Sequence, residues 1–76
     1  LLLDKVEFKN IQPGDLILLR INNWPQHLAI ISSVRPIKII HSYIQAKKVV
    51  EHHLPEEWQN RIMAIYRSNN KIGEKT

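Results

Sequence analysis

The sequence predicts a mainly β fold, with about five antiparallel strands forming a small sheet or half-barrel and one short helical turn. Apolar and polar residues alternate over several segments, as they do in half-buried strands. Turn residues separate these segments at short intervals. The chain of 76 residues has room for one small domain, because a chain of this size buries only about 60% of the surface that its unfolded form exposes. We expect a single β domain over residues 1–67 and a polar, flexible tail over residues 68–76.

The first clear turn is Gln12–Asp15, where proline fixes one backbone angle and glycine supplies a positive φ. The preceding residues 1–10 fit a short helix or an extended segment equally well. Leu16–Leu19 is apolar on both faces and predicts a strand that is covered on each side. Little of so short a chain is left to cover the second face, which indicates either a missing layer or a half-barrel that closes on itself. Asn22–Pro25 predicts the next turn.

The centre of the chain predicts a β-hairpin. Two alternating segments, Gln26–Ile31 and Ile37–Ser42, flank a five-residue turn at Ser32–Pro36. We prefer the register that matches apolar residues across the two strands, which places Ile31 opposite Ile37 and Ala29 opposite Ile39. A slip by one residue would move the second strand's apolar side chains to the other face.

The preferred register brings two histidines together. Its period of two places His27 directly opposite His41, with Cβ atoms about 4.5–5.5 Å apart. Imidazoles at that separation can share a hydrogen bond, so that one fixes the tautomer of the other. The alternative is that both are ordinary strand residues whose ring nitrogens are satisfied by backbone groups or water.

The remaining segments complete an antiparallel arrangement. Tyr43–Lys47 predicts a turn, and Val49–His52 predicts another strand. Pro55–Gln59 predicts one helical turn, with proline at an early position and acids near the positive end of the helix dipole. Arg61–Arg67 predicts the last strand.

Composition narrows the classes of function without selecting one. The net charge of +4 and the absence of cysteine both come directly from the sequence. The charge is compatible with nucleic acid, an anionic envelope polymer or an acidic membrane surface as partner. Direct support for nucleic-acid binding is weak, because the basic residues are dispersed and the aromatics are not spaced as a stacking platform. No apolar run approaches the roughly 18 residues of a transmembrane helix. Without cysteine the chain contains no disulfide, thiolate metal site or cysteine nucleophile.

Other candidate chemistry is less well supported. His52 and His53 are neighbours on a strand and point to opposite faces, so at most one of them can join His27 and His41 at a single ion. We therefore predict no metal or other cofactor and expect both residues at an exposed strand edge. The remaining polar candidates have simpler structural roles, as solvated hairpin hydroxyls, an exposed helical turn and a turn cap: Ser32 and Ser42, Glu56 and Glu57, and Asp15.

Several segments, taken in order, carry a family resemblance. They are Pro13–Arg20, His27–Ile31, Ile40–Tyr43, Val49–Glu51 and Arg61–Arg67. Together they resemble the C-terminal half of an NlpC-type cell-wall peptidase, and their order and spacing are most similar to the phage-borne branch. Members of that family are papain-like cysteine peptidases that cleave peptidoglycan stem peptides.

The resemblance implies a role for each matching residue. His27 matches the general base and His41 matches the polar residue that orients it. Trp24 and Tyr43 would line the substrate side, or serve as packing aromatics. The family's cysteine comes from an earlier helix that this sequence lacks, so we predict that the chain is inactive on its own. The implied partners are a peptidoglycan stem peptide and a cysteine-bearing half, and the implied location is the cell envelope or a phage particle.

Two other classes of function stay open. The first is a small β-barrel that uses its positive charge to bind an anionic polymer, either nucleic acid or an envelope glycan. The second is a structural fragment that needs a partner to fold. The first predicts salt-sensitive binding by the chain itself.

Overall fold

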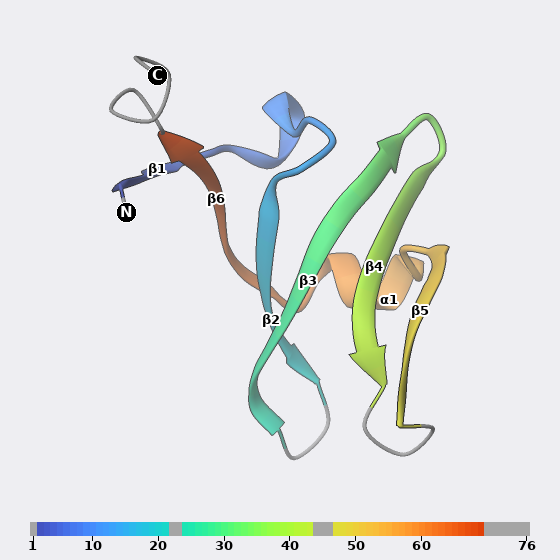
Figure 1. Cartoon of the computed structure of the whole chain (residues 1–76). Helices are drawn as coiled ribbons and strands as arrows, with labels where there is room; N and C mark the ends of the chain where they lie inside the picture. The colour runs from blue at the N-terminus through green and yellow to red at the C-terminus, as the bar shows by residue number, and fades with distance from the viewer. Residues whose placement is uncertain (1, 22–23, 44–46, 70–76) are drawn as a thin grey trace, which may run out of the picture.

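The computed structural model describes residues 2–21, 24–43 and 47–69, with only the backbone described for residues 24–26 and 43. These residues form six antiparallel strands in one open sheet of order β1-β6-β2-β3-β4-β5 (Figure 1). The strands are β1 (Leu2–Lys5), β2 (Leu16–Ile21), β3 (Trp24–Val34), β4 (Ile37–Tyr43), β5 (Lys48–His53) and β6 (Ile62–Asn69). A 3-10 turn, η1 (Phe8–Asn10), and a short helix, α1 (Glu56–Gln59), complete the described elements. The predicted mainly β class is confirmed.

The strand beyond the expected five is β1, at one edge of the sheet. It pairs with the end of β6, from Leu2 opposite Asn69 to Lys5 opposite Tyr66. Of the first ten residues, Leu2–Lys5 is therefore extended and Phe8–Asn10 forms the 3-10 turn η1, with no α-helix among the described residues 2–10. β6 reaches Asn69, two residues into the segment expected to be a tail, and residues 70–76 lie outside the described part of the chain.

The turn at Gln12–Asp15 is confirmed, and hydrogen bonds to the Asp15 carboxylate hold it in place. Gly14 has a φ of +97°, the left-handed region that glycine favours. Asp15 is only 1% exposed, and its Oδ2 accepts a hydrogen bond from the Gln12 amide at 2.8 Å. Arg67 in β6 donates to the same carboxylate twice, from Nε at 2.9 Å and from Nη2 at 3.0 Å. The turn is therefore tied to the last strand.

The hairpin exists, but the expected register and turn are wrong. β3 continues to Val34, so only Arg35 and Pro36 connect it to β4. Ile31 pairs with Ile39 instead of Ile37, because the strands continue to an irregularity between Ile31 and Ser33. The observed register differs by two residues from the predicted one. A shift of two preserves the face of every side chain, whereas a shift of one would reverse it.

Two expected turns also begin or end differently. Trp24 and Pro25 belong to β3 instead of the turn predicted at Asn22–Pro25, because β3 pairs with β2 as far as Ile21 opposite Trp24. Tyr43 is still part of β4, opposite Lys48. The remaining residues of these two predicted turns, 22–23 and 44–46, lie outside the described ranges.

The core lies on one face of the sheet. Ile17, Leu19, Ile31 and Ile39 have no exposed surface, and Ala29, Leu54 and Ile65 are also buried in this cluster. α1 crosses the same face behind β3 and β4 and places Trp58 against the core (Figure 1). The opposite face is more open, with Leu28 60% and Ile30 43% exposed. The expectation that β2 is covered on both faces is thus wrong for its second face, where Leu16 and Leu18 are half-buried. Among the described residues, no helix is long and apolar enough to cross a membrane.

Candidate functional site

Three histidine rings form a continuous hydrogen-bonded chain on the core face of the sheet. His27 Nε2 in β3 lies 2.8 Å from His41 Nδ1 in β4. The other ring nitrogen of His41, Nε2, lies 2.7 Å from Nε2 of His52 in β5. Nδ1 of His52 lies 2.7 Å from the backbone carbonyl oxygen of His53. The central ring is therefore linked on both sides, and one end of the chain stops at a backbone acceptor.

The strand registers explain why these rings meet. Ile31 pairs with Ile39, so continuing by the period of two puts Ala29 opposite His41, and His27 becomes its diagonal neighbour. On the other side Ile39 pairs with His52, which makes His52 diagonal to His41 as well. Diagonal neighbours are about 7–8 Å apart, with their Cβ atoms somewhat closer, a gap that two imidazoles can span. In both contacts the ring centroids are 4.8 Å apart and the planes are nearly perpendicular, at 81° and 85°.

Trp58 of α1 lies against all three rings. Its centroid is 6.3 Å from that of His27 and 5.6 Å from those of His41 and His52, in edge-to-face geometry each time. His41 is only 5% exposed, whereas His27 and His52 are half-buried. The indole thus shields the central ring and leaves the two outer rings partly open to solvent.

Burial favours the uncharged form of His27 and His41. It lowers the pKa of His27 from its ordinary value of 6.5. Burial also lowers the pKa of His41, and the positive charges that His27 and His52 would carry lower it further, while a backbone hydrogen bond at Ser42 opposes the change. Two adjacent imidazolium ions in this small space would repel each other. At neutral pH the neutral rings are therefore favoured.

The sequence-predicted site is assembled in part. His27 and His41 come together, although through a diagonal contact instead of a direct cross-strand pair. The backbones of Trp24 and Tyr43 lie at the start of β3 and the end of β4, but their side chains are outside what the structure describes. The structure does not place these two aromatic side chains relative to the histidines.

His52 is the residue that sequence reasoning missed. It is half-buried and hydrogen-bonded to His41 instead of lying at an exposed strand edge, whereas His53 is exposed as expected. The available signal was the alternation of β5, which turns His52 to the same face as Val50. The register with β4 was also needed, because only that register brings His52 next to His41.

The three rings are connected in series instead of converging on one point. Both nitrogens of His41 face neighbouring ring nitrogens. Across residues 2–21, 24–43 and 47–69, no group of three or more histidine, aspartate or glutamate side chains is arranged to hold a metal ion. In this arrangement each ring can share a proton with its neighbour and fix that neighbour's orientation.

The other polar candidates lie apart from the histidine chain. The Ser32 hydroxyl donates to Glu51 Oε2 at 2.7 Å, and Ser42 is exposed on the face opposite His41. Glu56 and Glu57 are exposed in the first turn of α1, and Asp15 is held in its own turn and by Arg67, as described above. None of these side chains supplies one of the three links of the histidine chain.

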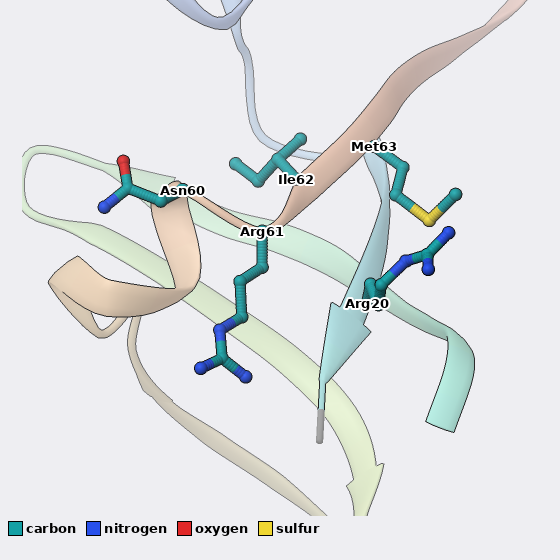
Figure 2. Close-up of a pocket in the computed structure, with 5 residues that line it drawn as sticks. All are labelled: Arg20, Asn60, Arg61, Ile62 and Met63. Carbon is teal, nitrogen blue, oxygen red and sulfur yellow. The ribbon is translucent and has the colours of Figure 1, made fainter. Parts of the chain in front are cut away.

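A second feature is a shallow pocket of about 320 Å³ near the end of α1. Figure 2 shows its lining residues, which are Arg20, Asn60, Arg61, Ile62 and Met63. The backbone holds the two arginines together, since the Arg20 amide donates to the Arg61 carbonyl at 3.0 Å. Neither guanidinium is ion-paired with any residue that the structure describes. The pocket therefore offers two uncompensated positive charges beside apolar side chains.

Comparison with known proteins identifies no relative. No family model, no curated protein and no solved structure matches this chain.

Proposed function

We propose that this chain supplies the general base and its orienting residues to a cysteine peptidase of the NlpC type, which cleaves peptidoglycan stem peptides. The observation that carries the proposal is the 2.8 Å contact between His27 Nε2 and His41 Nδ1. The two residues that the resemblance pairs as base and orienting group are hydrogen-bonded to each other on the core face. In this proposal the histidines act on a thiol that the 76 residues do not contain.

The chemistry requires this division of roles. A cysteine attacks as its thiolate, so a nearby imidazole must take the thiol proton and later return it to the leaving amine. The base must also keep one tautomer and one orientation, which a hydrogen-bonded neighbour provides. His27 has such a neighbour in His41, and it is the more open of the two rings. His41 is buried between two rings and Trp58, which suits an orienting group better than a base.

The test requires the protein in its native source. We would isolate the species that carries these 76 residues under mild conditions, record its intact mass, and assay cleavage of purified stem peptide with and without iodoacetamide. We expect cleavage that iodoacetamide abolishes and that is lost in a His27→Ala variant. A matched Lys48→Gln variant changes an exposed residue of β5 and should cleave at the unaltered rate. Cleavage that persists after His27→Ala, or that is insensitive to the thiol reagent, would refute the assignment.

A second candidate function is favoured by the pocket at Arg20 and Arg61. Two guanidinium groups beside an asparagine, neither of them ion-paired within the described part of the chain, can bind carboxylate or phosphate groups of an anionic polymer. In this alternative the chain binds the polymer and the histidines have only a structural role. Binding of heparin or single-stranded DNA to the 76-residue chain should then weaken steeply with salt.

Charge-matched variants separate specific binding from general attraction. Arg20→Gln and Arg61→Gln should weaken binding more than Arg35→Gln, which removes an equal charge from the exposed hairpin turn. Equal losses for all three variants would mean that only the net charge attracts the polymer. Absence of binding at low salt would exclude this function.

A further inference from the structure

We infer that His52 is a positioning residue: with the backbone carbonyl of His53, it fixes one tautomer along the whole histidine chain and leaves Nδ1 of His27 as the unprotonated nitrogen. The contacts His27–His41, His41–His52 and His52–His53 carry the inference. The catalytic role that this inference gives to His52 rests on the proposed function. The direction of the hydrogen bonds does not depend on that function.

The direction of the chain is set at its backbone end. A carbonyl oxygen only accepts hydrogen bonds, so the 2.7 Å contact between His52 Nδ1 and the His53 oxygen requires a proton on Nδ1. A neutral imidazole has one N–H and one acceptor nitrogen. Nε2 of neutral His52 is therefore an acceptor.

Because each neutral imidazole has one donor and one acceptor nitrogen, the tautomer of His52 also sets those of His41 and His27. Because Nε2 of His52 accepts, the 2.7 Å contact requires His41 to donate from its own Nε2. Nδ1 of neutral His41 is then an acceptor, and the 2.8 Å contact requires His27 to donate from Nε2. Nδ1 of His27 is left without a proton and carries the free lone pair. Along these three contacts, the backbone carbonyl of His53 in β5 determines which nitrogen of His27 is basic.

This assignment has a mechanistic consequence. When His27 accepts a proton from a thiol, the proton goes to Nδ1, and Nε2 keeps its N–H donated to His41. The resulting imidazolium remains hydrogen-bonded to the lone pair of His41 Nδ1. The opposite polarity would place a proton on Nδ1 of His27 and turn the only acceptor nitrogen toward His41. His52 therefore acts through His41, with no contact to the reacting atoms.

Imidazole nitrogen NMR tests the inference on the 76-residue chain. Long-range proton–nitrogen correlation spectra distinguish protonated from unprotonated ring nitrogens. They are recorded at about pH 8, above the ordinary histidine pKa of about 6.5. We expect protons on Nδ1 of His52 and on Nε2 of His41 and His27. A wild-type spectrum with the proton on Nδ1 of His27 would overturn the inference.

Two substitutions at His52 change its hydrogen-bonding capacity in opposite directions. His52→Glu introduces a side chain that only accepts, so His41 and His27 should keep their wild-type tautomers. His52→Lys introduces one that only donates, so the signals of both rings should move to the opposite tautomer. A purely structural role for His52 predicts the same tautomers in both variants, and that result would also overturn the inference. If the lysine variant does not fold, the wild-type spectrum still tests the tautomers of all three rings, and a glutamate variant in which His41 or His27 changes tautomer would overturn the inference.

The neighbouring residue supplies the control. His53→Gln alters an exposed side chain and retains the backbone carbonyl, so all three tautomers should remain unchanged. Failure of the inference and failure of the proposed function are distinguishable. The expected tautomers without any peptide cleavage would leave the inference intact and refute the function. Peptide cleavage that depends on His27, combined with a spectrum showing the proton on its Nδ1, would support the function and refute the inference.

Discussion

Asp15→Asn should destabilise the chain far more than any exposed charge substitution. Asp15 is 1% exposed and accepts three hydrogen bonds, from the Gln12 amide and from Nε and Nη2 of Arg67. Asparagine has the same size but lacks the charge, and its NH₂ group would turn a donor toward Gln12 or Arg67. Breaking a buried ion pair on one side costs about 3–5 kcal/mol. The Arg67 side chain is 37% exposed and regains some hydration, so we expect the lower end, about 3 kcal/mol.

Urea denaturation and thermal melting measure this loss directly. For a domain of this size 1 kcal/mol corresponds to about 4–8 °C, so the melting temperature should fall by roughly 12–24 °C. The exposed pair Lys9–Glu7, at 3.7 Å, provides the control. Glu7→Gln should cost less than about 0.5 kcal/mol, because solvent screens exposed pairs.

The pH dependence of the same variant provides a second check. Burial alone would raise the pKa of Asp15, but the hydrogen bonds from Arg67 and Gln12 outweigh burial and lower it below 3.8. The carboxylate's contribution is therefore fully present above pH 3.8 and is lost as the pH falls through the lowered, folded-state pKa. The difference between wild type and Asp15→Asn should shrink in acid. A difference in the free energy of unfolding below about 0.5 kcal/mol at neutral pH would refute the reasoning, because an exposed ion pair contributes about as much. A difference that stays constant into strong acid would refute it as well.

Three further predictions concern the core and the histidines. Ile39→Ala removes a side chain with no exposed surface and should cost about 2–5 kcal/mol in urea denaturation, whereas Val49→Ala, at a 68% exposed position, should change stability by less than about 0.5 kcal/mol. Folding lowers the pKa values of His27 and His41, so below pH 6.5 the unfolded chain binds more protons than the folded chain. The melting temperature should therefore fall as the pH drops below 6.5, and an unchanged melting temperature would contradict this. Trp58→Ala uncovers both rings, so their pKa values in an NMR titration should rise toward 6.5, and values that remain as in wild type would mean that the indole does not shield them.

The sequence predicts which face of the sheet a strand residue occupies better than it predicts which residue lies opposite on the neighbouring strand. Alternation correctly placed His27, Ile31 and Ile39 on one face, because a period of two specifies which side of the sheet a residue occupies. It does not specify which pair lies opposite, since shifts by two residues keep the same faces. The partners are set by the turn, and the structure uses the two residues Arg35 and Pro36 where the sequence suggested five.

Long-range pairings account for most of what the sequence could not predict. Asp15 and Arg67 are separated by 52 residues, and no local pattern links a turn aspartate to an arginine in the last strand. β1 escaped prediction for the same reason: its four residues are all exposed, so alternation gives no signal, and the strand exists because β6 pairs with it. Both features depend on β6 lying beside β2, which is a property of the sheet order.

The register error explains why the candidate site was found and also why it was incomplete. His27 and His41 were expected as a direct pair, yet a diagonal pair on the same face is still within reach of two imidazoles. The diagonal offset has a consequence that direct pairing lacks. It leaves the far nitrogen of His41 facing β5, where His52 is again diagonal. Two successive diagonal steps thus produce a chain of three rings with a direction, which is set by the carbonyl oxygen of His53 at its His52 end.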